Sequence, residues 1–185
     1  LRMGEIVRMI FEKFGVILID GDITKVVDEL FKRNYGKSTS VFKKGACAVL
    51  EAFAGQAVYI VTNSATDKVS AKIEELGSQK GGKPNSLAWL LPRVRGLAGK
   101  FDIFPDFDDL AESMKLPGLD RPVLLRRGHY FKVLNDLREQ HGAAWEDVTV
   151  VGDIFELDLA LPLALGAEVV LVPNENTPQY EIDYV

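Results

Sequence analysis

Four short runs of apolar, mostly β-branched residues constrain most strongly what this chain can fold into. They are Val16–Ile19, Ala57–Val61, Val148–Val151 and Val169–Val172, and each is largely unbroken rather than alternating with polar residues. Unbroken runs of this length are typical of strands that are covered on both faces within a parallel sheet. A weaker fifth run, Pro122–Leu125, completes the set of predicted strands.

Helical patterns lie between these runs. The spacing of apolar residues predicts four helices, at Ala46–Phe53, Asp67–Leu76, Tyr130–Arg138 and Leu157–Leu165. Strand and helix therefore alternate, which is the order of βαβ units. We predict an α/β fold, a three-layer α/β sandwich with a central parallel sheet.

The length of 185 residues suits one domain, so we predict a single domain over residues 1–185. The segment Gly77–Pro84 (GSQKGGKP) has the glycine-rich, polar composition of a flexible surface segment. A small insertion is therefore expected at about residues 77–98. The chain opens with Leu1 rather than methionine, as an excerpt of a longer protein would.

Charge and cysteine content limit the functional classes. The net charge of -5 argues against a broad nucleic-acid interface. Cys47 is the only cysteine, so no internal disulfide can form, and a reducing, cytoplasmic location is expected. The apolar runs are too short to span a membrane, and Leu1–Lys13 lacks the features of a signal peptide.

Polar residues follow three of the predicted strands. They are Asp20, Gly21, Asp22, Ile23 and Thr24 after the first, Thr62, Asn63 and Ser64 after the second, and Gly152, Asp153 and Asp158 after the third. Ligands bind outside the carboxyl ends of strands in open parallel sheets, so we expect these residues to meet at one edge. Singly, each is equally well explained as a turn former or helix cap. Together, the acids would repel one another without a cation, which predicts a site for a divalent metal ion.

Three segments resemble motifs of the haloacid dehalogenase-like (HAD) hydrolase superfamily. Val16–Thr24 (VILIDGDIT) resembles the first motif, an apolar strand ending in D-x-D-x-T. Ala57–Asn63 (AVYIVTN) resembles the second, and Val148–Gly166 resembles the fourth, a strand followed by G-D-x-x-x-x-D. The motifs occur in the family's order and span nearly the whole chain. The resemblance implies a Rossmann-like HAD fold and a magnesium-dependent phosphatase.

The resemblance also implies a role for each matching residue. Asp20 would attack phosphorus to form a covalent aspartyl-phosphate. Asp22 would act as general acid and base, and its backbone carbonyl would reach Mg²⁺. Thr62 would donate its hydroxyl to the phosphate, helped by backbone N–H groups at Asn63. Metal ligation would involve Asp20, Asp22 and Asp153, with Asp158 either ligating Mg²⁺ or orienting its ligands. A carboxylate at position 22 suits phosphate esters and disfavours dehalogenation.

The third motif departs from the family pattern. The family places a lysine, often followed by proline, at the start of the helix before the last motif. The corresponding stretch is Arg126–Lys132 (RRGHYFK), where spacing favours Arg127 and chemistry favours Lys132. Either residue is equally well explained as a solvated helix charge.

The spacing of the motifs leaves no room for a full cap domain, either between Asp20 and Thr62 or between Thr62 and Arg127. We therefore expect little or no cap and an open site. Such a site would serve a bulky phosphorylated substrate, small molecule or macromolecule, or take its lid from a partner subunit in a homo-oligomer.

Two other functions fit parts of the pattern. A receiver-like phosphoacceptor signalling domain also combines acids, Thr or Ser, and Lys around magnesium, but the G-D-x-x-x-x-D segment and the length count against it. A catalytically weak HAD-fold binding or scaffold protein is favoured by the irregular third motif.

Overall fold

The computed structural model describes residues 3–37, 41–78, 85–104, 107 and 110–185, so most of Gly77–Pro84 lies outside the described residues. The chain divides into two compact units, Leu1–Lys44 and Gly45–Val185. Each unit is described by itself below. The assignment of residues 1–185 to one domain stays a prediction.

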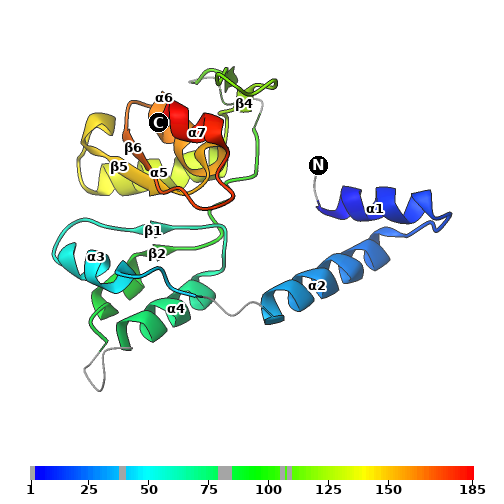
Figure 1. Ribbon diagram of the computed structural model, residues 1–185, viewed down its shortest axis with the longest axis horizontal. Helices are drawn as coiled ribbons and strands as arrows, with labels where there is room; N and C mark the ends of the chain where they lie inside the picture. Colours follow the sequence, from blue (N-terminus) through cyan, green and yellow to red (C-terminus); the bar gives the residue numbers. More distant parts are fainter. Residues whose placement is uncertain (1–2, 38–40, 79–84, 105–106, 108–109) are drawn as a thin grey trace. The chain divides into compact units, whose positions relative to one another are not determined.

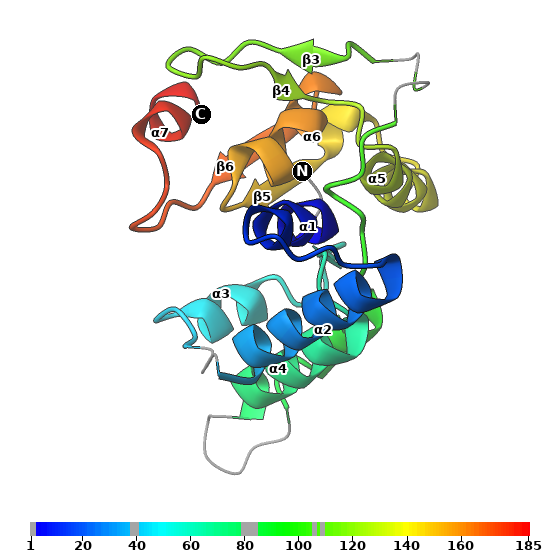
Figure 2. The ribbon, with the colours of Figure 1, turned by 90° about the vertical axis from the view of Figure 1, so that its right-hand side faces the viewer.

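The amino-terminal unit, Leu1–Lys44, is built from two helices, α1 (Met3–Lys13) and α2 (Asp20–Lys37), which lie side by side in Figures 1 and 2. Val7 of α1 and Ile23 of α2 are buried. A Cβ atom added to Gly4 would lie 3.3 Å from Cγ2 of Ile23, so the two helices approach closely at this glycine. Burial of these apolar side chains holds the helix pair together.

The prediction of a strand at Val16–Ile19 is wrong for this structure. These residues link α1 to α2 without regular secondary structure, and Ile17 and Ile19 are 88% and 70% exposed. An apolar run becomes a strand only where a neighbouring strand supplies hydrogen-bond partners. The described part of this unit contains only helices, so the run has no such partner within its own unit.

The described strands of the carboxyl-terminal unit, Gly45–Val185, form three two-stranded sheets. Two pairs are parallel, β1 (Ile60–Val61) with β2 (Val94–Arg95) and β5 (Thr149–Gly152) with β6 (Glu168–Leu171), and one is antiparallel, β3 (Ser113–Met114) with β4 (Val123–Leu124). Four of the five predicted strands are confirmed, as β1, β4, β5 and β6. The fold is mixed α/β with short strands in small sheets, and the described strands do not join into one central sheet (Figure 1).

Four described helices of this unit correspond to the predicted ones: α3 (Ala46–Ala52), α4 (Thr66–Ser78), α5 (Gly128–Gln140) and α6 (Ala160–Ala164). A further helix, α7 (Gln179–Tyr184), was not predicted. The helix predicted at Leu157–Leu165 begins with one π-helical turn, Phe155–Leu159, before it becomes α6. Among the described helices, none is both long and apolar enough to cross a membrane.

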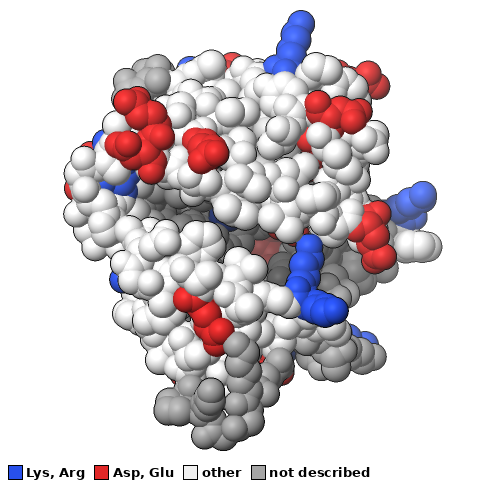
Figure 3. Space-filling view, turned by 60° about the vertical axis from the view of Figure 1, so that its left-hand side comes forward, with Lys and Arg blue, Asp and Glu red and all other residues white. Residues whose placement is uncertain are grey.

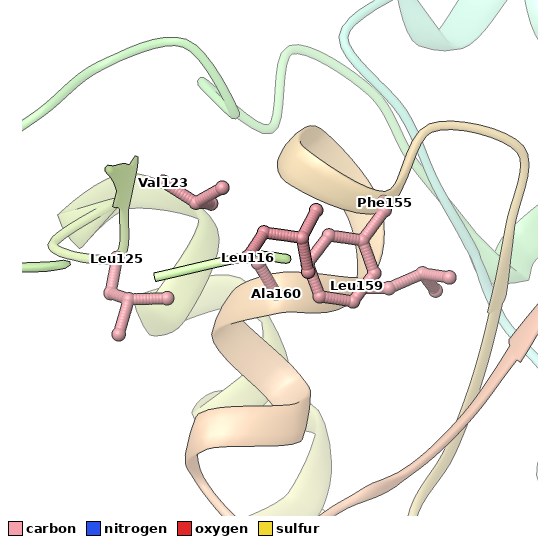
Figure 4. Close-up of a cluster of buried hydrophobic side chains, with 6 residues drawn as sticks. All are labelled: Leu116, Val123, Leu125, Phe155, Leu159 and Ala160. Carbon is pink, nitrogen blue, oxygen red and sulfur yellow. The ribbon is translucent and has the colours of Figure 1, made fainter. Parts of the chain in front are cut away.

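The main hydrophobic core lies between the β3–β4 hairpin and the turn that follows β5. Figure 4 shows three side chains from each side, Leu116, Val123 and Leu125 from the hairpin region and Phe155, Leu159 and Ala160 from the turn and α6. Partly buried side chains of β5 and β6, including Val150 and Val169, pack against the same cluster. This core fixes the segment that carries Asp158, because Asp158 lies directly before the buried Leu159.

The described part of the expected insertion, residues 85–98, belongs to the interior of this unit. Leu87, Leu90 and Val94 are buried. A 3₁₀ turn at Ala88–Arg93 leads directly into β2, which pairs with β1. The segment therefore completes the parallel pair on which the candidate site is built.

Replacing Leu159 by alanine should lower the free energy of unfolding by about 3 kcal/mol, because it leaves a cavity in the main core. Leu97→Ala is the matched control, since Leu97 is exposed, and should cost less than about 0.5 kcal/mol. Urea denaturation of both variants checks this expectation. Equal destabilisation by the two substitutions would contradict the assigned core.

Candidate functional site

Backbone hydrogen bonds hold together the segments that follow β1 and β2. The N–H of Thr62 donates to the carbonyl of Arg95 at 3.0 Å, and the N–H of Ala98 donates to the carbonyl of Thr62 at 2.9 Å. The N–H of Leu97 donates to the carbonyl of Ser64 at 3.0 Å. The chain leaving β2 therefore runs alongside the loop that follows β1 and carries Lys100 to the carboxyl end of the pair.

Lys100 connects the ends of two strand pairs. Its backbone N–H donates to Oδ1 of Asn63 at 2.8 Å, and its Nζ donates to Oδ1 of Asp158 at 2.7 Å. The two side chains of this ion pair are only 11% and 13% exposed. Nζ of Lys100 also lies 4.9 Å from the centroid of the Tyr130 ring, close enough for a cation–π interaction. The polar ends of β1 and β5 are thus joined through one buried lysine.

The second carboxylate oxygen of Asp158 organises the loop after β5. Oδ2 accepts hydrogen bonds from the backbone N–H of Asp153 at 3.3 Å and of Ile154 at 3.1 Å. A Cβ atom added to Gly152 would lie 2.4 Å from Cβ of Asp158, so only glycine fits at this position. Both oxygens of Asp158 are therefore committed to partners within the protein.

Tyr130 supports the same residue from α5. Its hydroxyl donates to the backbone carbonyl of Asp158 at 2.9 Å. Burial raises the pKa of the Tyr130 hydroxyl above its ordinary value, and the nearby Asp158 charge raises it further. Tyr130 therefore stays protonated and keeps donating at any pH at which the protein would work.

Arg127 is buried and contacts the backbone at Lys100. Its side chain is only 4% exposed. Nη1 donates to the backbone carbonyl of Lys100, and Nη2 lies 3.6 Å from Oε1 of Glu156. Burial lowers the pKa of the Arg127 guanidinium, and the Glu156 charge opposes that shift. Its Nε has no partner within the described residues. This geometry suits a residue that positions Lys100 rather than one that contacts solvent-borne substrate.

Lys132, the other candidate for the third motif, lies on the surface of α5. Its Nζ is 2.6 Å from Oδ2 of Asp136, one helical turn further on, and its side chain is 72% exposed. The pair is an ordinary solvated ion pair on a helix. Nothing in its surroundings directs Lys132 toward Asp158 or Asn63.

Asp20 and Asp22 belong to the amino-terminal unit, where they occupy the first turn of α2. The Asp20 side chain is 92% exposed, and its Oδ1 accepts a hydrogen bond from Nη2 of Arg8 at 2.6 Å. Oδ1 of Asp22 lies 3.7 Å from Nζ of Lys25. Thr24 donates its hydroxyl to the carbonyl of Asp20 at 3.0 Å. All of these contacts are local to the helix pair.

The other predicted site residues belong to the carboxyl-terminal unit. Thr62 and Asn63 follow β1, and Asp153 and Asp158 follow β5. Oγ1 of Thr62 accepts the N–H of Ser64 at 3.1 Å. Asp153 is exposed, and its carboxylate has no ion-pair partner in the described part of the chain. Of these residues, Asn63 and Asp158 are joined through Lys100, and Asp153 is linked to Asp158 through its backbone N–H.

In the carboxyl-terminal unit, the candidate metal ligands are the acidic residues that follow β5. Among the described residues there is no group of three or more His, Cys, Asp or Glu side chains placed to hold a metal ion. Mg²⁺ takes oxygen ligands and is often bound by only one or two carboxylates. The exposed carboxylate of Asp153 suits that chemistry, whereas both oxygens of Asp158 are already used. Asp158 therefore fits the orienting role better than the ligating one.

Lys100 is the residue that sequence reasoning missed. It follows β2, a strand whose run Val94–Ala98 is interrupted by Arg95 and Gly96 and so lacks the unbroken apolar pattern. Had β2 been recognised, Lys100 would have stood out as a basic residue just beyond a strand's carboxyl end. The sequence feature that could have identified Lys100 is its position just after a strand. Its spacing from Asp153, by which Arg127 was selected, does not identify it.

Comparison with known proteins finds no matching family model, no matching curated protein and no matching solved structure. The resemblance to HAD hydrolases therefore depends on the three sequence motifs.

Replacing Lys100 by methionine should lower the free energy of unfolding by about 3 kcal/mol, because it leaves the Asp158 carboxylate buried without its cation. Lys132→Met is the matched control and should cost less than about 1 kcal/mol, since its ion pair is exposed. Chemical denaturation measures both. Adding Asp158→Asn to Lys100→Met should recover part of the loss; a strictly additive further loss would contradict the coupling of this pair.

Proposed function

We propose that this chain is a magnesium-dependent phosphatase of the HAD superfamily that acts through a covalent aspartyl-phosphate on Asp20. The observation that carries the proposal is the Lys100 cluster, in which one buried lysine joins Asn63 after β1 to Asp158 after β5. A cation and polar groups held together at strand ends suit a site for an anionic, phosphate-bearing substrate.

The proposal includes the finer architecture, a three-layer sandwich with one central parallel sheet. Both β1–β2 and β5–β6 are parallel pairs, and parallel sheets occur almost only where helices cover both of their faces. Val151 in β5 and Val170 in β6 are exposed. We propose that β1–β2 and β5–β6 belong to one central parallel sheet whose layers would bury these side chains.

In the proposed reaction, Asp20 attacks phosphorus, and the bond from phosphorus to the ester oxygen breaks. Asp22 gives a proton to the leaving oxygen and then takes one from the water that hydrolyses the aspartyl-phosphate. The Thr62 hydroxyl and the N–H of Asn63 donate hydrogen bonds to the non-bridging phosphate oxygens. Attack at Asp20 requires its carboxylate to leave Arg8, which is its partner within the helix pair.

Lys100 supplies the cation that the family's third motif provides. Its ammonium group offsets the charge of Asp158 and of the substrate phosphate. Arg127 would act as a positioning residue through its bond to the Lys100 carbonyl. In this assignment Lys132 has no part in the reaction.

Mg²⁺ would be held by Asp20, by the backbone carbonyl of Asp22 and by Asp153. Asp158 would orient the loop that carries Asp153 through its bonds to two backbone N–H groups. When bound, Mg²⁺ neutralises negative charge on the phosphate oxygens. The substrate class is a phosphoric monoester, small or macromolecular, that reaches an open site without a full cap domain.

A binding or scaffold protein with weak catalysis is the second candidate. Two observations favour it. The Asp20 carboxylate pairs with Arg8, and both carboxylate oxygens of Asp158 already accept hydrogen bonds from groups of the protein. In that case the Lys100 cluster would serve only the stability of the fold.

Asp20→Asn should abolish magnesium-dependent hydrolysis of an aryl phosphate while leaving folding intact, because an amide cannot act as the nucleophile. Asp153→Asn removes a proposed carboxylate ligand of Mg²⁺ and should lower the hydrolysis rate at least roughly a hundredfold. Steady-state assays with and without EDTA measure both effects. Asp136→Asn is the control, since it removes an exposed carboxylate that pairs only with Lys132, and should leave the rate unchanged.

The proposal fails if the wild-type chain hydrolyses none of a panel of phosphate esters in the presence of Mg²⁺. It also fails if Asp20→Asn retains full activity. The first outcome, with an unchanged denaturation profile, would favour the scaffold protein.

A further inference from the structure

Two arginines converge on one tyrosine at the amino ends of β1 and β2. Tyr59 directly precedes β1, and Arg93 and Arg95 flank Val94 of β2. The guanidinium carbons of Arg93 and Arg95 lie 5.9 and 5.3 Å from the centroid of the Tyr59 ring. The backbone carbonyl of Arg95 accepts the N–H of Thr62, whereas the guanidinium groups of this arginine pair, Arg93 with Arg95, lie near the Tyr59 ring.

In the part of the chain that the structure describes, the arginine pair has no acidic partner. Within the described residues, neither guanidinium forms an ion pair with a carboxylate, whereas several other arginines do. These paired arginines are Arg8, Arg33, Arg121, Arg127 and Arg138. Two like charges held near one ring repel each other, and the ring's quadrupole offsets only part of that cost. An anion bound between them would remove the repulsion.

Backbone carbonyls hold each guanidinium by one nitrogen and leave the others available. Nη1 of Arg93 donates to the carbonyl of Gln56, and Nη1 of Arg95 donates to the carbonyls of Pro92 at 2.9 Å and Val94 at 3.2 Å. The Nε and Nη2 groups of both arginines have no acceptor in the part of the chain that the structure describes. Both guanidinium groups are thus held in place while some of their N–H donors remain unused.

The Tyr59 ring is itself held by residues at the carboxyl end of α5. The Tyr59 hydroxyl lies 2.8 Å from Nε2 of His141 and accepts a hydrogen bond from Nε2 of Gln140 at 3.3 Å. On the other side, the Arg93 guanidinium carbon lies 5.2 Å from the centroid of the Trp89 ring. The cluster is therefore preorganised, which reduces the entropy lost when a ligand binds.

We propose that Arg93 and Arg95 form a binding site for the phosphate group of a small ligand, separate from the Lys100 cluster. Guanidinium forks bind phosphate oxygens in bidentate fashion, and two of them match one phosphate group. A small ligand is favoured over a polyanion because the net charge is -5. On the face drawn in Figure 3, basic and acidic residues are interspersed and form no broad basic patch. The ligand is either inorganic phosphate or a phosphorylated small molecule, which share this chemistry.

Titration of the full chain with inorganic phosphate in EDTA tests the site, since EDTA removes the metal that the proposed catalytic site needs. Calorimetry should show saturable binding, and Trp89 fluorescence should change as Arg93 engages the anion. Arg93→Gln and Arg95→Gln should each weaken binding roughly tenfold, the loss expected for one charge-assisted hydrogen bond. Arg33→Gln removes an equal charge from a paired, exposed arginine and should leave binding unchanged.

Two further titrations distinguish inorganic phosphate from a phosphorylated small molecule as the ligand. Tighter binding of glycerol phosphate than of inorganic phosphate would assign the site to phosphorylated small molecules, and the reverse order to the free ion. Unchanged phosphate affinity in Asp153→Asn would support a site distinct from the proposed catalytic one.

Three results would overturn the proposal: no saturable phosphate binding, binding that is unaffected in both Arg93→Gln and Arg95→Gln, or tighter binding of a single-stranded oligonucleotide than of either phosphate ligand. Thermal denaturation of each variant confirms that it is folded. Two independent single variants keep the test decisive if one of them is unstable.

Discussion

The buried ion pair between Lys100 and Asp158 is the interaction on which the rest of the carboxyl-terminal unit's polar architecture depends. Taking two charges out of water is costly, and such a pair is retained only where additional hydrogen bonds satisfy its remaining atoms. Here Asn63, Tyr130 and the N–H groups of Asp153 and Ile154 provide these bonds to the pair and its backbone. Removing either partner would leave the other charge uncompensated, so the loops after β1 and β5 are held in a fixed relation.

Much of the carboxyl-terminal unit could be predicted because its signals are local. Unbroken apolar runs end within one residue of the ends of β1, β5 and β6, and helical spacing located α4 and α5 to within a few residues. The strand β2 was missed because Arg95 and Gly96 break its pattern, and Lys100 was missed with it. Such a strand is specified by its partner β1 and by the burial of Leu90 and Val94, which sequence periodicity does not reveal.

The amino-terminal unit shows the opposite case. Val16–Ile19 has the clearest strand composition in the chain, yet it links two helices because the described residues of its unit include no neighbouring strand. Strand formation is a property of a pair and not of a segment. The cation beside Asp158 was missed for a related reason, because Lys100 comes from a loop remote in sequence. Arg127 was favoured by its spacing and Lys132 by its chemistry.

Phosphorylation of Asp20 is the step on which the proposed reaction depends. The most direct measurement is acid quenching of the enzyme during turnover of a labelled phosphate ester, followed by mapping of the labelled peptide. We expect acid-stable, alkali-labile phosphate on the peptide that contains Asp20. Turnover without any label, or label on a residue other than Asp20, would contradict the account.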